Sequence, residues 1–271
     1  MITNTGDDVE VYGVHVSPDP DLVTYWLADA IDERGYGLRE DSFEVMAALE
    51  AAGRETWFRL GDRDLAMCLL RTELLGRGER LTAAHAAVTR ALGVAARVLP
   101  MADEPVRTHV RARGRRLGLQ EFMIVEGAAG PVESVEFHGA DAARPTPEVR
   151  EAIAGAEVIV IGPSNPVASI GPILALPGLR AALGSASAPT VAVSPFVGGR
   201  AVKGPTELFC HSSGIACSAQ GIADHYGDLV DAVVADEGVE GRPQRHLDTS
   251  MDDAAGRARV AQATLELATS L

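Results

Sequence analysis

Long apolar runs are missing from this 271-residue sequence. A membrane-spanning helix needs about 18 consecutive apolar residues, and no stretch reaches that length. The opening residues, MITNTGDDVE, lack both a basic flank and an apolar core, so we expect no signal peptide. These absences predict a cytoplasmic protein that does not act at a membrane.

Cysteine is also scarce, and the three cysteines form no CxxC pair. An odd, sparse set predicts reduced thiols rather than a disulfide framework. His225 and His246 have no partner at a ligand spacing, which argues against metal binding by histidine. No GxGxxG segment is followed by an acidic residue about 20 positions later, which argues against a nicotinamide-dependent oxidoreductase.

Basic residues are outnumbered, 24 against 38 acidic ones, which gives a net charge of −14. This balance argues against nucleic acid and against an anionic membrane surface as partners. An anionic substrate would need a metal ion or a local basic cluster to offset the field. Apolar residues make up 46% of the chain, which predicts a folded globular protein.

The stretch EVIVIGPSNPVASIGPILAL, residues 157–176, is the one around which the chain is organised. Its apolar run at 158–161 is typical of a strand buried on both faces in a parallel sheet. Gly162-Pro163-Ser164-Asn165-Pro166 ends the strand, and a helix is predicted at 169–176. Ligands of open α/β sheets bind at such turns, and this turn suits an anion or a nucleotide. An ordinary strand-to-helix turn is equally compatible with the pattern.

Two further buried strands, at 189–194 and 230–235, alternate with helices, so we predict an α/β fold with a doubly wound, mostly parallel, Rossmann-like sheet. We expect a single domain over 1–271, with 40–130 as a helical and hairpin subdomain over the active site. Helices are predicted at about 21–32, 42–52, 64–76, 82–92, 145–154, 206–213, 219–226 and 251–271. Shorter strands are predicted at 95–99 and 122–125, a half-exposed strand or hairpin at 9–16, and an exposed arginine-rich hairpin at 106–120.

Four carboxylates, those of Asp7, Asp8, Asp19 and Asp21, lie at the ends of predicted elements. That placement suits a divalent cation bound by oxygen ligands. Helix capping and turn formation are the alternative. They explain Asp19 well as an N-cap before Pro20, explain Asp21 partly, and explain the adjacent pair Asp7 and Asp8 poorly.

Two basic residues allow a functional and a structural interpretation. Arg63 stands between Asp62 and Asp64, where it forms either a self-neutralising surface cluster or a grip on a phosphate or a ring edge. Lys203, beside Gly204, either places an ammonium near a phosphate or is an exposed loop residue.

These motifs, in this order, resemble the 2-phospho-L-lactate transferases of coenzyme F420 biosynthesis. The resemblance covers essentially the whole chain and is carried by NTGDD at 4–8, SPDPD at 17–21, LGDRDLA at 60–66, LPM at 99–101, GPSNP at 162–166, SIGPIL at 169–174, VSP at 193–195, GG at 198–199 and KGP at 203–205.

The resemblance implies transfer of a phospholactyl or phosphoenolpyruvyl group from a guanosine-diphosphate-activated acid to the ribityl hydroxyl of the deazaflavin FO. GMP is released, Mg²⁺ is the cofactor, and the enzyme is expected to be a homodimer. The alternative is a catalytically inactive truncated paralogue that binds nucleotide or deazaflavin.

The resemblance also implies roles for individual residues. It makes Asp7, Asp8 and Asp21 the magnesium ligands, and Asp7, Asp21 and Arg63 the catalytic residues. The deazaflavin or its ribityl tail would contact Asp8, Asp62, Asp64, Met101, Asp103 and Gln120. The guanosine diphosphate would lie on Gly162, Pro163, Ser164, Asn165, Ser194 and Lys203.

Three positions depart from the family pattern. Met1 stands where the family's second strand begins, so we expect that a glycine-rich strand-to-helix unit is absent, through a misassigned start or a real loss. Met67 and Cys68 replace a usual Thr-His pair, which removes one expected substrate contact. Pro20 replaces the usual leucine and is compatible with a helix start.

Overall fold

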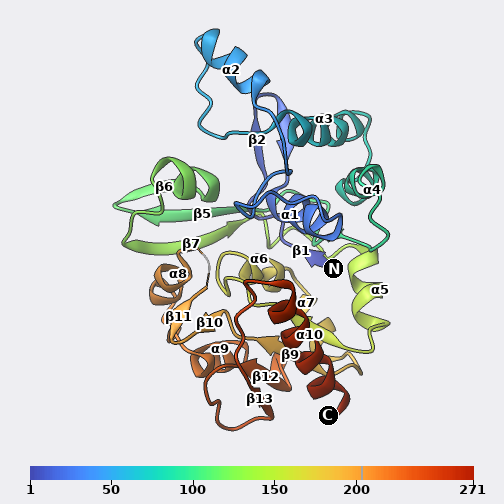
Figure 1. Cartoon of the computed structure of the whole chain (residues 1–271), viewed down its shortest axis with the longest axis vertical. Coiled ribbons are helices and arrows are strands. Elements are labelled where there is room, and N and C mark those ends of the chain that lie inside the picture. The colour runs from blue at the N-terminus through green and yellow to red at the C-terminus, as the bar shows by residue number, and fades with distance from the viewer. Residues whose placement is uncertain (203) are drawn as a thin grey trace. The chain divides into compact units, whose positions relative to one another are not determined.

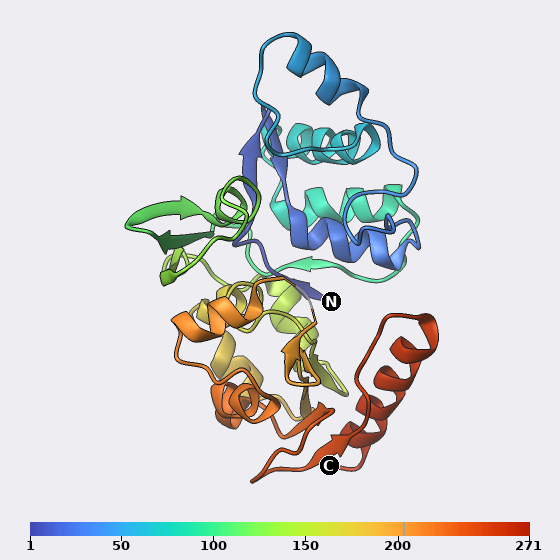
Figure 2. The same ribbon diagram turned by 60° about the vertical axis from the view of Figure 1, so that its left-hand side comes forward.

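The computed structural model describes residues 1–202 and 204–271. The chain forms two compact units, each of which takes up more than one segment (Figures 1 and 2). Unit 1 comprises Met1–His109, Leu117–Ala129 and Phe137–Val149, and unit 2 comprises Val110–Arg116, Gly130–Glu136 and Arg150–Leu271.

Unit 2 is built on a four-stranded sheet in the order β13-β12-β9-β8, in which every pair of neighbours is parallel. The strands are β8 (Ile159–Ile161), β9 (Thr190–Val193), β12 (Ala232–Ala235) and β13 (Gln244–His246). The helices of this unit are α6 (Ile170–Ala175), α7 (Leu179–Gly184), α8 (Thr206–Ser212), α9 (Ala219–Tyr226) and α10 (Ala254–Thr269). Parallel strands flanked by helices confirm the predicted α/β class.

Strand β12, inside this sheet, is buried on both faces. Successive side chains of a strand point to opposite sides. Ala232 and Val234 accordingly join the apolar cluster that contains Val260 of α10, while Val233 and Ala235 join the cluster formed with α9 (Figure 1). One unbroken apolar run therefore supplies two cores.

Between β9 and α8, unit 2 carries a short antiparallel hairpin of β10 (Phe196–Val197) and β11 (Arg200–Ala201). Its turn contains Gly198 and Gly199, both with positive φ, a conformation that side chains disfavour. A 3₁₀ turn at Gly227–Leu229 joins α9 to β12.

In unit 1 the hairpin β2 (Val9–Val11) and β3 (Val14–Val16) packs on α2 (Glu44–Ala51) and α3 (Asp62–Gly76). Val14 and Val16 lie in one core cluster with Met46, Leu65 and the fully buried Cys68. The loop 4–8 leads directly into β2, so the packed hairpin fixes the end of the acidic motif.

The remaining helices of unit 1 are α1 (Pro18–Leu27) and α4 (Leu81–Ala91), and α4 lies alongside α3 (Figure 2). Tyr25 of α1 packs with Ile31 and Leu38 in a separate cluster. Strand β1 (Ile2–Thr3) pairs in parallel with β4 (Leu99–Pro100), so the predicted strand at 95–99 is reduced to its end.

A three-stranded sheet in the order β6-β5-β7 contributes residues to both units. Its strands are β5 (Arg107–Ala112), β6 (Arg115–Gly118) and β7 (Val132–His138), and α5 (Pro147–Ala154) follows it. Side chains along β5 alternate as predicted, with Thr108, Val110 and Ala112 buried and Arg111 exposed.

Two local predictions were wrong. Residues 122–125 were expected to form a strand, but Glu121–Val125 is a π-helical turn in which Phe122 is buried and Val125 is 55% exposed. A run of four apolar residues is too short to distinguish these states. Helix α1 begins at Pro18, with Ser17 as its N-cap in place of Asp19, and ends before Asp29, whose φ is +50°.

None of the helices among the described residues has the length and apolar character that crossing a membrane requires.

Candidate active site

A cavity of about 590 Å³ opens in unit 1 beside the acidic motif. Backbone and side chains of the β1–β2 loop form one wall, and β5 with the segment that follows β6 forms another. Its lining residues are Gly6, Asp7, Asp8, Val9, Glu10, Glu55, Trp57, Arg107, Thr108, His109, Gly118, Leu119, Gln120, Glu121 and Val125.

Asp7 is the most strongly perturbed acid of this wall, with 7% of its surface exposed. Its Oδ1 accepts from the Asn4 amide at 3.4 Å, and its Oδ2 accepts from the Gln120 amide at 3.2 Å. Burial and the charges of Asp19 and Asp8 raise its pKa well above the usual range. Burial also raises the pKa of Asp19 to about 6, although a hydrogen bond from Asn4 opposes the rise.

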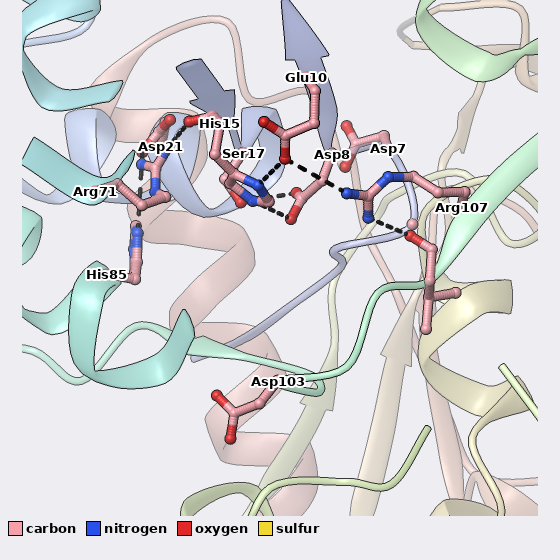
Figure 3. Close-up of polar contacts among 12 residues, drawn as sticks. Asp7, Asp8, Glu10, His15, Ser17, Asp21, Arg71, His85, Asp103 and Arg107 are labelled. Atoms are coloured by element: carbon pink, nitrogen blue, oxygen red, sulfur yellow. Dashed lines mark hydrogen bonds and ion pairs between the residues drawn. The ribbon is translucent and has the colours of Figure 1, made fainter. Parts of the chain in front are cut away.

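Asp8 is held at both oxygens (Figure 3). Its Oδ1 accepts from Ser17 Oγ at 2.7 Å, and its Oδ2 lies 3.0 Å from His15 Nε2. The other ring nitrogen of His15 lies 2.5 Å from Glu10 Oε1, and Arg107 is 4.0 Å from the same oxygen. Burial lowers the pKa of His15, but the two carboxylates outweigh it, and the net shift is upward.

Asp21 belongs to a buried ion pair. Its Oδ1 accepts from Arg71, a side chain with no exposed surface, and Arg71 also donates to the His15 carbonyl at 3.1 Å. His85 lies next to this pair and bonds Thr24 Oγ1 at 3.1 Å. Burial and the charge of Arg71 lower the pKa of His85 to about 3, so its ring is neutral.

A shared divalent cation needs ligand atoms that lie close together. Among the described residues, one group of three carries ligand atoms within 4.8 Å of one another, namely Asp21, Asp64 and Cys68. This is not the predicted set of Asp7, Asp8 and Asp21. Arg71 already compensates the charge of Asp21, which weakens its case as a ligand.

The acidic residues of the cavity wall offer oxygen ligands, the type that magnesium prefers. Asp7 repels its acidic neighbours Asp8 and Asp19, and a cation would relieve that repulsion. Thr108 Oγ1 is buried there and has no hydrogen-bond partner within the described residues. Asp7, Asp8 and Asp19 therefore carry the ligand type of a hard divalent ion, but their oxygens do not form a group of three within 4.8 Å of one another.

Asp64 accepts a hydrogen bond from Tyr25 Oη at 2.6 Å, and it does not line the cavity. Burial and the charge of Asp21 raise its pKa to about 7, although the bond from Tyr25 opposes the rise. Burial likewise raises the pKa of the Cys68 thiol far above its usual range, so Cys68 is protonated.

Four other predicted site residues in unit 1 lie outside the cavity lining. Asp62 accepts from Ser42 Oγ and from the first backbone amides of α2, and Asp103 accepts from both donors of Thr82 at the start of α4. Arg63 is exposed and donates to the Arg39 carbonyl at 3.1 Å, and Met101 is fully buried. In this arrangement the two aspartates act as helix caps.

The predicted nucleotide turn lies in unit 2, between β8 and α6. Asn165 Oδ1 accepts from the amides of Val167 and Ala168, both at 2.9 Å, so the amide oxygen stabilises the turn itself. Gly162, Pro163 and Ser164 follow β8 directly and are not buried. Ser194, at the end of β9, is buried and accepts from the Phe196 amide at 3.1 Å. Lys203 lies outside the described residues.

Comparison with known proteins decides the family. The model of the family described as 2-phospho-L-lactate transferase CofD matches residues 1–266. The chain belongs to the CofD family.

Curated members of the CofD family cover almost all of this chain. A phosphoenolpyruvate transferase from Kitasatospora aureofaciens is 38% identical over 99% of the chain and 88% of its own length. Another from Thermobifida fusca is 39% identical over 100% of the chain and 87% of its own length. A 2-phospho-L-lactate transferase from Methanosarcina mazei is 37% identical over 88% of the chain and 78% of its own length.

The fold of this CofD-family chain also resembles a solved structure. A crystal structure of a UPF0052 family member from Bacillus halodurans superposes with a TM-score of 0.54 at 21% identity. The match covers 88% of this chain and 73% of that one. This likeness supports the α/β fold alone.

Sequence reasoning missed several residues that the fold places at the site of this CofD-family chain. Glu10 and His15 are directly opposite each other in the β2–β3 hairpin, and cross-strand pairing could have indicated their contact. Trp57 and Arg107 line the cavity, and Arg71 pairs with Asp21 from 50 positions away. No local pattern indicates a pairing over such a distance.

Proposed function

We propose that this CofD-family transferase moves a phospholactyl or phosphoenolpyruvyl group from a guanosine-diphosphate-activated acid to the ribityl hydroxyl of FO in coenzyme F420 biosynthesis. The observation that carries the proposal is the family match over residues 1–266. The names of the relatives support both donor types. In this reaction the hydroxyl oxygen bonds to the phosphorus distal to guanosine, and the bond to GMP breaks.

The cavity in unit 1 is the proposed acceptor site. Trp57 offers an aromatic face for a planar ring, and the side chains of Arg107 and Gln120 can bond ring or ribityl oxygens. The cavity volume of about 590 Å³ lies within the range of small-molecule sites.

Asp7 and Asp19, with Asp8 beside them, are the residues that would hold Mg²⁺. When bound, the ion would supply positive charge to the diphosphate oxygens. The geometry favours Asp19 over Asp21 in this role, because Asp21 already pairs with Arg71. The set of Asp7, Asp8 and Asp21, which the family resemblance implies, is the alternative and differs only in having Asp21 in place of Asp19.

Asp7 is the proposed acceptor of the proton from the attacking hydroxyl. A general base must lie within hydrogen-bond reach of the hydroxyl that it deprotonates, and Asp7 lines the proposed acceptor cavity. Gln120 orients this carboxylate by donating to Oδ2. Asp21 is proposed to act next to it, held by Arg71, and a catalytic role for Arg63 remains a prediction.

The guanosine end of the donor is proposed to bind in unit 2. The turn at 162–165 follows a parallel strand at its carboxyl end, the usual ligand position in such sheets. The half-buried side chain of Ser164 and nearby backbone amides are the proposed contacts, with Ser194 and Lys203 as further predictions.

Purified protein mixed with FO, Mg²⁺ and each activated acid tests the proposal. Mass spectrometry should detect the FO phosphodiester and GMP, and chelation of Mg²⁺ should abolish both. We expect Asp7→Asn to lower the turnover number at least a hundredfold. Asp29→Asn is the matched control, because the Asp29 side chain is 98% exposed, and it should retain full activity.

Absence of product with both donors would contradict the proposed transfer. Binding of FO or GDP without turnover would instead favour the inactive, ligand-binding alternative. Sedimentation of the same sample measures the predicted homodimer separately from activity.

A further inference from the structure

His15 is a buried side chain whose two ring nitrogens both face carboxylates of the cavity wall. It is 9% exposed, with Nε2 3.0 Å from Asp8 Oδ2 and Nδ1 2.5 Å from Glu10 Oε1 (Figure 3). The ring itself does not line the cavity, whereas Asp8 and Glu10 do. His15 therefore acts on the cavity from behind its wall.

Helix α3 fixes the backbone of His15 from the opposite side. The His15 amide donates to Thr72 Oγ1 at 2.7 Å, and the His15 carbonyl accepts from Arg71 Nη1 at 3.1 Å. Two consecutive residues of one helix thus hold both polar backbone groups of His15. Thr72 Oγ1 in turn donates to the Cys68 carbonyl at 2.7 Å within the same helix.

The fixed position of His15 matters because His15 bonds one of the two oxygens of the Asp8 carboxylate. Ser17 Oγ fixes Oδ1, and His15 Nε2 fixes Oδ2, so the plane of the carboxylate is determined. With the Ser17 bond alone, the carboxylate could turn about that contact. A carboxylate with a fixed plane presents its remaining lone pairs in one direction only.

We infer that His15 is a positioning residue, which sets the orientation of the Asp8 carboxylate in the cavity and transmits the position of α3 to it. The inference rests on the proposed function, in which Asp8 faces the acceptor and the ion. The ring nitrogen that orients the Asp8 carboxylate is Nε2.

Two substitutions of His15 distinguish the contact made by Nε2 from the contact made by Nδ1. His15→Gln places an amide N–H near the position of Nε2 and keeps the contact to Asp8, whereas His15→Asn places one near Nδ1 and keeps only the contact to Glu10. Both remove the ring, and asparagine removes one methylene more than glutamine, so thermal unfolding of each variant separates lost packing from the effect on turnover. A purely structural role predicts equal activities for the two variants.

We expect the turnover number of His15→Gln to stay within about tenfold of the wild type, and that of His15→Asn to fall about a hundredfold, the usual effect of a misplacement near 1 Å. The Michaelis constant for FO should change little in either. His211→Gln and His211→Asn, at an exposed position on α8, form the matched control pair and should leave turnover unchanged.

Equal turnover in the two His15 variants overturns the inference. If the wild type transfers nothing, the proposed function fails on its own, and crystal structures of the two variants decide the positioning role. A wild-type Asp8 orientation in His15→Gln with a rotated carboxylate in His15→Asn supports it, and an unrotated carboxylate in His15→Asn overturns it.

Discussion

At the scale of single residues, unit 1 concentrates charge where water is scarce. Asp21 and Arg71 are both buried, and each has one polar atom without a hydrogen-bond partner among the described residues, Oδ2 and Nε. Such a pair often adds little net stability, because desolvation offsets the attraction. Removing one partner is costly, since it leaves the other charge buried and alone.

Arg71→Met should therefore lower the free energy of unfolding by about 3–5 kcal/mol. The double variant Arg71→Met with Asp21→Asn should recover most of that loss, because no charge is then left unpaired. Urea unfolding of the wild type, both single variants and the double variant measures the coupling. Additive losses in the double variant would contradict it.

Asp64 gives a pH dependence with a definite sign. Its pKa rises from 3.8 in the unfolded chain to about 7 in the fold, so the folded protein binds this proton more tightly. Ionisation therefore destabilises the fold progressively as pH rises from about 4 to about 7. Asp64→Asn keeps an oxygen for Tyr25 and cannot ionise.

We expect Asp64→Asn to match the wild type near pH 4 and to exceed its stability by up to about 4 kcal/mol at pH 8. Urea unfolding at a series of pH values measures the difference. A difference that does not change with pH would show that Asp64 ionises normally in the fold.

At the scale of elements, helix α9 depends on one glycine. A Cβ at Gly221 would lie 2.1 Å from the carbonyl oxygen of Ala216, a backbone atom that cannot move aside cheaply. A Cβ at Gly76, at the end of α3, would have no atom within 4 Å. The two positions form a matched pair for the same substitution.

Gly221→Ala should destabilise the protein by about 1–3 kcal/mol through overpacking. Gly76→Ala should be neutral or stabilise it by up to about 1 kcal/mol, because alanine favours the helix. Thermal unfolding of both variants provides the measurement. A neutral Gly221→Ala would mean that the start of α9 shifts without cost.

Elements with a strong local pattern could be predicted from the sequence. The strand before Gly162 and the helix Ala219–Tyr226 follow from apolar runs and from helix start signals, and both are confirmed. The predicted burial of that strand on both faces is wrong, because it is the edge strand of its sheet and Val160 is 46% exposed. Strand β13 could not be predicted, because all three of its residues are exposed and polar and only pairing with β12 makes them a strand.

The candidate site divides in the same way. Asp7, Asp8 and Gln120 line one cavity, and the two aspartates were singled out by an acidic motif that capping explains poorly. Asp62 and Asp103 carry the residue types of a site, yet their oxygens satisfy helix amides. Composition does not distinguish a cap from a ligand, because both need an exposed carboxylate lone pair.

At the scale of the whole molecule, the net charge of −14 opposes any anionic substrate. Salt screens that repulsion, and at 0.1 M ionic strength charges more than roughly 10 Å apart hardly interact. We expect kcat/KM for the guanosine-diphosphate-activated acid to rise between about 20 and 200 mM KCl at fixed Mg²⁺. Steady-state kinetics with the acid limiting measures it, and a fall would show that local basic groups govern the approach.

Strand β8 has a consequence for how the protein behaves in concentrated solution. It bonds β9 on one side, and no described strand pairs with its other side, where the Val160 side chain is 46% exposed. The unpaired backbone amides and carbonyls of an apolar edge strand can hydrogen-bond another chain and so promote aggregation. Light scattering should therefore grow with storage concentration, and Val160→Lys should suppress that growth by placing a charge on the border.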